Sequence, residues 1–226
     1  MSPAATSGAA PERRVTLKLA TSLDGRIATA AGESRWITGS PARQAVHGLR
    51  AEHDAVVVGI ETVLADDPEL TVRLAGYDGP QPARVVLDSR QRLPLNGRLA
   101  QTAALIPVYV VTPQPPSQAL LDAGIKVVQV AAGDGGRPDL LATVATLSAE
   151  GLRRLFIEGG GQVASAFLRA GLVTDLEWFR APTLLGEEGR AGVGPLAVLA
   201  LSSAPRFKRI EARAVGDDLW ERYRRP

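Results

Sequence analysis

The chain has 226 residues, of which 45% are hydrophobic and 22% charged, which is ordinary for a folded globular domain. Its net charge is only +2 and its arginines are spread along the chain, so a nucleic-acid partner is not expected. Cysteine is absent and only two histidines occur, which excludes disulfides and a catalytic thiol and makes a metal site unexpected. No run of about eighteen apolar residues is present, so we expect no membrane span and a cytoplasmic protein.

The chain is predicted to form one domain after a short tail. Residues 1–13 are rich in Ala, Ser, Gly and Pro and lack the basic and apolar regions of a secretory signal. We therefore predict a disordered tail over 1–13 and a single domain over 14–226.

Short β-branched runs alternate with helical stretches along this domain. The predicted strands are 15–20, 55–59, 84–87, 107–111, 126–130, 155–157 and 175–179, and the predicted helices are 41–50, 118–123, 139–150 and 162–170. Ser40 followed by Pro41 is typical of an N-cap and a first helical position. The alternation predicts an α/β fold with a mostly parallel sheet and helices on both faces. Residues 207–215 and 219–223 flank a Gly-Asp-Asp turn and predict an antiparallel edge hairpin.

A run of three glycines follows Glu158 at the end of the predicted strand 155–157. Glycine lets the backbone approach a ligand closely, and the helix that follows presents free N–H groups at its positive end. The run is interpreted either as a phosphate cradle at the carboxyl end of a parallel strand or as a tight turn without a ligand. Its spacing is not that of the dinucleotide-binding fingerprint.

The strand 15–20 runs into a polar turn, with Lys18, Ser22 and Asp24 close together. Lys18 either donates a proton or binds a phosphate in a cleft, or it is solvated at a strand edge. Trp36, between polar residues ahead of a helix, either stacks on a flat ring or packs in the core.

After the strand 55–59 the sequence reads as a long polar loop with adjacent Asp66 and Asp67 before Pro68. The two carboxylates bind a metal, act as a general base or cap a turn. Turn capping is the commonest role of such a pair.

Taken in order, these segments resemble the pyrimidine reductase family of riboflavin biosynthesis, whose fold is like that of dihydrofolate reductase. The matching segments are 17–26, 32–39, 49–51, 62–73, 86–88, 158–161, 170–175 and 181–186. They cover nearly the whole chain after residue 14, and several separated motifs in one order are far more specific than any one of them.

The resemblance implies NADPH-dependent hydride transfer to the sugar C1′ of a phosphoribosylaminopyrimidine, which converts a ribosyl group to a ribityl group. The positions that match the family's NADPH contacts are Ala20, Trp36, Thr62, Asp66, Gly159, Gly160, Gly161, Gln162 and Val163. Those that match its substrate contacts are Ser34, Arg50, Leu70, Arg73 and Glu158. Two arginines suit a bidentate clamp on a ribose phosphate.

For the chemical step we expect Lys18, Asp24 and Glu158 to be catalytic, with Lys18 or Asp24 managing the proton or the ring-opened hydroxyls. The family commonly forms homodimers, and the apolar stretch 193–201 is either an interface or an internal helix.

The sequence departs from the family pattern in two respects, and it leaves two alternative functions open. Glu61 adds a negative charge beside Thr62, and the zinc motif of the family's deaminase half is absent. A reductase of the same fold acting on another pterin or pyrimidine such as dihydrofolate is one alternative, although two arginines favour a phosphorylated substrate. A non-catalytic nucleotide-binding protein is the other. NADPH and NADH are not distinguished, since Arg35, Arg43 and Arg90 are all candidate partners of a 2′-phosphate.

Overall fold

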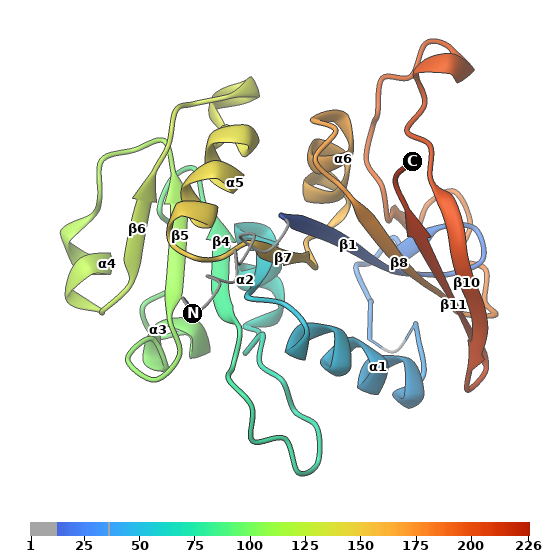
Figure 1. Cartoon of the computed structure of the whole chain (residues 1–226), viewed down its shortest axis with the longest axis horizontal. Coiled ribbons are helices and arrows are strands. Elements are labelled where there is room, and N and C mark those ends of the chain that lie inside the picture. The colour runs from blue at the N-terminus through green and yellow to red at the C-terminus, as the bar shows by residue number, and fades with distance from the viewer. Residues whose placement is uncertain (1–12, 36) are drawn as a thin grey trace, which may run out of the picture.

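The computed structural model describes residues 13–35 and 37–226, which form one large sheet with helices on both faces (Figure 1). The strands of this sheet are β1 Arg14–Thr21, β3 Ala55–Gly59, β4 Ala83–Leu87, β5 Val108–Thr112, β6 Lys126–Gln129, β7 Arg154–Ile157, β8 Asp175–Arg180, β10 Lys208–Val215 and β11 Asp218–Arg224. They lie in the order β10-β11-β8-β1-β7-β3-β4-β5-β6. β2 Arg26–Ala28 and β9 Arg190–Ala191 pair in a separate ribbon.

The strands from β8 to β6 are parallel to one another, and β11 and β10 continue the sheet in antiparallel pairing. The predicted α/β fold with a mostly parallel sheet and an antiparallel C-terminal edge hairpin is confirmed. Because all the parallel strands point the same way, their carboxyl ends meet at one edge, where such sheets bind ligands.

Two apolar cores hold the helices against the sheet. Helices α1 Ser40–Ala51, α2 Ile60–Asp66, α3 Arg98–Gln101 and α4 Gln118–Asp122 pack on one face, and α5 Leu140–Ala149 and α6 Gly161–Arg169 pack on the other. In β3, Val56 and Val58 belong to the first core while Ala55 and Val57 belong to the second. Burial on both sides explains why this strand is a continuous apolar run.

The C-terminal hairpin turns through Gly216 and Asp217, with Gly216 at a φ of +63°. Asp218, predicted in the turn, instead begins β11, and its carboxylate accepts the N–H of Gly39 at 2.7 Å. The hairpin is therefore tied to the start of α1.

Two details of the sequence prediction are wrong, and one of two alternatives is excluded. Ser40 is the first helical residue, and Gly39, which has an extended backbone and no side-chain cap, is the N-cap. The segment after β3 is the helix α2 rather than a loop: Ile60 and Val63 face the core, but two turns are too short to show a clear period. Of the two alternatives for the stretch 193–201, the internal helix is excluded, because residues 193–200 are irregular and lead into the 3-10 turn Leu201–Ser203.

Residues 1–12 of the predicted tail lie outside the described residues, and so does Trp36. Within the described ranges, no helix is both long enough and apolar enough to cross a membrane.

His53 lies in the interior at the end of α1. Its side chain is 4% exposed, with Nδ1 2.6 Å from the Leu49 carbonyl oxygen and Nε2 2.8 Å from Oγ1 of Thr16. The ring also contacts Phe156, at 4.9 Å between ring centroids. Both nitrogens are bonded in a site without room for hydration, which favours the neutral ring.

Because His53 is buried, we predict that the protein loses stability in mild acid. Burial, with smaller contributions from Arg14 and Arg154, lowers the pKa of His53 from 6.5 to about 4. The unfolded chain therefore binds one more proton between those values, so stability is full above about pH 6.5 and falls as the pH drops towards 4. The loss attributable to His53 approaches about 3 kcal/mol. Urea unfolding across this range should show a steeper loss for the wild type than for His53→Gln, and parallel curves would contradict the assignment.

Candidate functional site

A cleft of about 360 Å³ opens at the carboxyl edge of the parallel strands. β1 contributes Lys18 and Ala20, the end of β7 contributes Glu158, and α2 contributes Thr62 and Asp66. The other residues that line it are Leu19, Ile27, Ser34, Arg35, Ile37, Thr38, Arg43, Gly159, Gly160 and Gly192. The cleft thus collects side chains from segments far apart in the sequence.

Arg50 from α1 and Glu158 from the end of β7 form an ion pair beside Lys18. Nε and Nη2 of Arg50 lie 2.6 and 3.0 Å from the two carboxylate oxygens of Glu158, and Nη1 donates to the Thr71 carbonyl at 2.8 Å. Both side chains are about nine-tenths buried. Leu17 pairs with Ile157 in the sheet, so Lys18 and Glu158 occupy the next positions of adjacent strands.

The charges in this cluster control one another's ionisation. Burial alone would raise the pKa of Glu158, but Arg50, and after it Lys18 and His47, lower it below its usual value. Burial lowers the pKa of Lys18 despite the opposing charge of Glu158, and Arg50 lowers it further. Glu158 is therefore ionised at neutral pH, and Lys18 gives up its proton more readily than an exposed lysine.

The three glycines after Glu158 have different tasks. A Cβ on Gly159 would lie 2.7 Å from Val163, and one on Gly161 would collide with the carbonyl oxygen of Ala191, so both glycines permit close packing of the protein on itself. Gly160 has nothing within 4 Å of its Cβ position and lines the cleft. It is the N-cap of α6, and its carbonyl oxygen accepts the N–H groups of Val163 and Ala164 at 3.0 and 3.1 Å, which leaves the amides of Gly161 and Gln162 at the start of the helix for a ligand. Space for an anion lies at Gly160 and the start of α6 rather than along the whole run.

Glu61, the acidic residue next to Thr62, is bound by Arg92 at the surface of α2. Its carboxylate is 79% exposed and belongs to the solvent side of the helix, whereas Thr62 lines the cleft. The extra charge is thus paired with a guanidinium and turned away from the cleft.

The structure separates Asp24 from the cleft lining. Its carboxylate accepts Oγ–H of Ser22 at 2.5 Å and the N–H groups of Leu185 and Gly186 at 3.2 and 2.7 Å. The bond from Ser22 and these amides lower the pKa of Asp24 to about 2. Asp24 fastens one loop to another, a position that does not favour the proton-transfer role expected beside Lys18.

Of the predicted substrate residues, Ser34 and Glu158 line the cleft, and Arg50 stands directly behind Glu158. Arg73 is not among the lining residues, and its Nη1 lies 2.8 Å from Glu69 in a half-exposed ion pair. Leu70 is 3% exposed and has a φ of +57°, so it anchors this loop in the core through a strained backbone.

Some of the predicted cofactor residues also line the cleft, and others lie behind it. Ala20, Thr62, Asp66, Gly159 and Gly160 line the cleft. Gly161, Gln162 and Val163 form the first turn of α6 behind it.

Sequence reasoning did not single out His47, Thr38 or Ile27. His47 lies one helical turn before Arg50, and this spacing was the available signal. Thr38 lines the cleft from an irregular segment and Ile27 from the three-residue strand β2, and neither segment is long enough to show a periodic pattern.

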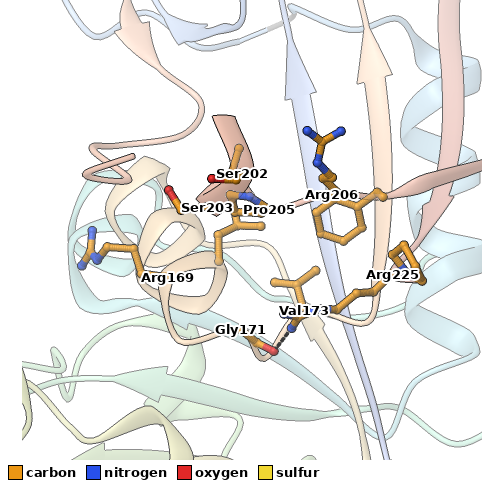
Figure 2. A pocket seen from close by; sticks show the side chains of 12 residues that line it. Arg169, Gly171, Val173, Ser202, Ser203, Pro205, Arg206 and Arg225 are labelled. Carbon is orange, nitrogen blue, oxygen red and sulfur yellow. Dashed lines mark hydrogen bonds between the residues drawn. The ribbon is translucent and has the colours of Figure 1, made fainter. Parts of the chain in front are cut away.

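A second cavity, of about 400 Å³, lies at the opposite end of α6, between Gly171, the 3-10 turn and the chain end (Figure 2). Three arginines line it, but each is bound to a backbone carbonyl: Arg169 to Pro195 at 2.6 Å, Arg206 to Leu201 at 3.4 Å and Arg225 to Gly171. Figure 2 shows Arg169 and Arg206 pointing in different directions. These side chains close loop ends and do not converge on a ligand.

The family profile described as the RibD C-terminal domain matches residues 13–220. The chain belongs to this family. The family resemblance found in the sequence is thereby confirmed.

Relatives and solved structures agree with the profile. The riboflavin biosynthesis protein RibD of Escherichia coli is 35% identical over 216 residues, which cover 91% of this chain and 58% of that protein. The 2,5-diamino-6-ribosylamino-4(3H)-pyrimidinone 5′-phosphate reductase of Methanothermobacter thermautotrophicus is 36% identical over 211 residues, covering 92% of this chain and 96% of the relative. A structure of Acinetobacter baumannii RibD has a TM-score of 0.83 at 38% identity and covers 95% of this chain and 58% of that one. The chain thus spans a little over half of its RibD relatives.

Proposed function

We propose that this chain is an NADPH-dependent reductase that converts the ribosyl group of a 5-phosphoribosylaminopyrimidine to a ribityl group. The observation that carries the proposal is that Lys18 lies beside Glu158, the partner of Arg50, in a cleft that Gly160, the N-cap of α6, also lines. The name of the Methanothermobacter relative, which this chain matches over almost its full length, supports a reductase of this class.

The cleft suits a nicotinamide dinucleotide. Gly160 offers open space beside the free amides of α6, which favour a phosphate group. Ala20, Thr62 and Asp66 would contact the cofactor along the β1 and α2 walls, and Arg35 and Arg43 line the same cleft and suit a 2′-phosphate. When bound, NADPH would supply the hydride.

The substrate would lie against the Arg50–Glu158 pair. Glu158 accepts hydrogen bonds from the pyrimidine or sugar, while Ser34 holds the opposite side. Arg73 reaches the ribose phosphate by exchanging its exposed partner Glu69 for a phosphate oxygen. Leu70 fixes the backbone that carries it.

In the proposed mechanism, Lys18 donates the proton. As the ribosylamine opens to its imine, the ammonium at Nζ donates to the ring oxygen, and Glu158 stabilises the positive charge that develops nearby. A lowered pKa suits Lys18 to this transfer near neutral pH.

NADPH oxidation measured by absorbance tests the function. The substrates are freshly made 5-amino-6-(5-phosphoribosylamino)uracil, its non-deaminated diaminopyrimidinone counterpart and dihydrofolate, with NADH in a parallel series. We expect turnover of a phosphoribosylaminopyrimidine with NADPH, and the preferred compound gives the order of reduction and deamination. Turnover of dihydrofolate alone indicates another reductase, and NADPH binding without any turnover indicates a binding protein.

The alkaline limb of the pH–rate profile tests Lys18. We expect kcat/KM to fall with an apparent pKa below the ordinary 10.5, and Glu158→Gln to move this limb to lower pH, because the carboxylate raises the pKa of Lys18. Lys18→Met should lose roughly 10²-fold or more in kcat. Asp24→Asn is the matched control and should leave the limb in place. Identical limbs in the wild type and Glu158→Gln would contradict the role of Lys18.

We also propose a homodimer formed through the stretch 193–201. Leu199 and Leu201 are 99% and 83% exposed, and this segment projects beyond the hairpin strands (Figure 1). Light scattering should give twice the chain mass, and Leu199→Asp with Leu201→Asp should give a folded monomer. Leu105→Asp, at an equally exposed leucine elsewhere, should remain dimeric. A monomeric wild type would refute the proposal.

A further inference from the structure

His47 stands between the two segments that carry the predicted substrate arginines. It lies on α1, three residues before Arg50. Its half-buried side chain contacts the irregular segment 71–73. Its Nδ1 lies 3.1 Å from the Thr71 carbonyl oxygen and 3.2 Å from the backbone nitrogen of Arg73. Arg50 donates to the same Thr71 oxygen at 2.8 Å. One ring nitrogen therefore lies beside the backbone nitrogen of Arg73 and beside the carbonyl oxygen that Arg50 binds, and these two arginines form the proposed phosphate clamp.

These two contacts of Nδ1 exclude each other. A ring nitrogen carries either a lone pair or a hydrogen in the ring plane, so it accepts from the Arg73 N–H or donates to the Thr71 oxygen, but not both. The Thr71 oxygen has two lone pairs and accepts Arg50 and His47 together in the second arrangement. In that arrangement the Arg73 N–H has lost its acceptor.

The ring exchanges between these arrangements without gaining charge. Burial, followed by the charges of Arg50 and Arg73, lowers the pKa of His47, while Thr71 and Glu158 oppose this to a smaller extent. The ring is neutral near pH 7 and its two arrangements are tautomers. Within the described residues no hydrogen bond to Nε2 is present, so Nε2 can release its proton to water while Nδ1 takes one up.

We propose that His47 is a positioning residue whose tautomer reports and stabilises occupation of the phosphate clamp. Without ligand, Nδ1 accepts the N–H of Arg73. When a phosphate binds, Nδ1 donates to the Thr71 carbonyl and frees the Arg73 N–H to bind a phosphate oxygen beside the two guanidinium groups. This inference rests on the proposed phosphorylated substrate.

The nitrogen shifts of the histidine rings test the relay directly. The chain has two histidines, so ¹⁵N-histidine labelling gives two ring systems, and His53→Gln assigns them. In the ligand-free protein we expect His47 to carry its proton on Nε2, and saturation with ribose 5-phosphate should move it to Nδ1. Ribose without phosphate should leave the tautomer unchanged.

Each other outcome overturns a defined part of the proposal. Binding of ribose 5-phosphate, measured from backbone amide shifts, with an unchanged His47 tautomer refutes the relay alone. A proton already on Nδ1 in the free protein also refutes it. If ribose 5-phosphate does not bind, the phosphate clamp of the proposed function fails together with the relay.

Steady-state kinetics separate positioning from general structure. His47→Asn keeps an amide at the place of Nδ1 that rotates to accept or donate, whereas His47→Leu does neither. We expect KM for the phosphorylated substrate to rise on the order of tenfold in His47→Leu, with kcat nearly unchanged, and to stay close to the wild-type value in His47→Asn. Equal KM values in the two variants, or a loss confined to kcat, would overturn the proposal.

Discussion

The buried pair of Arg50 and Glu158 is the interaction on which the cleft depends. Two charges taken out of water are tolerated only with good geometry and further hydrogen bonds, and here both carboxylate oxygens and Nη1 of Arg50 are satisfied. The pair joins α1, on one face of the sheet, to the end of β7 at its centre. It also sets the charge beside Lys18. Removing one partner alone would leave an uncompensated charge, at a cost of about 3–5 kcal/mol.

Close packing around α6 fixes the other wall. Val163 fits against both Gly59 and Gly159, so the ends of β3 and β7 approach the helix more closely than side chains would allow. The start of α6 is thereby held at the carboxyl edge, with Gly160 facing open space. Two of the three glycines thus serve the position of the helix, and the third leaves room for a ligand. In the proposed function, the affinity of the cleft for anions comes from the placement of this helix end.

Much of this architecture could be predicted because it follows from local patterns. The β-branched runs became the parallel strands, and Gly216 with Asp217 became the hairpin turn. The candidate site residues Glu158 and Gly160 could be predicted because they follow a strand at the carboxyl edge, and Lys18 because it lies on a strand that runs to the same edge. What failed depended on distant contacts. Asp218 of the hairpin binds the N–H of Gly39 at the start of α1, and Asp24 accepts the amides of residues 185 and 186. No pattern within either segment contains that information.

The arginines of the site differ in how firmly they are held, and this difference suits a phosphorylated ligand. Arg50 is fixed by a buried carboxylate and a carbonyl, so it provides a rigid charge. Arg73 is held by Glu69, which also binds Arg98, in ion pairs that solvent screens. Exposed pairs of this kind stabilise a protein by about 1 kcal/mol or less, whereas bidentate contacts to phosphate are among the stronger hydrogen bonds. In the proposed function, an entering phosphate would therefore replace Glu69 at little cost, and Arg73 would change its partner while the charge of Arg50 stays in place.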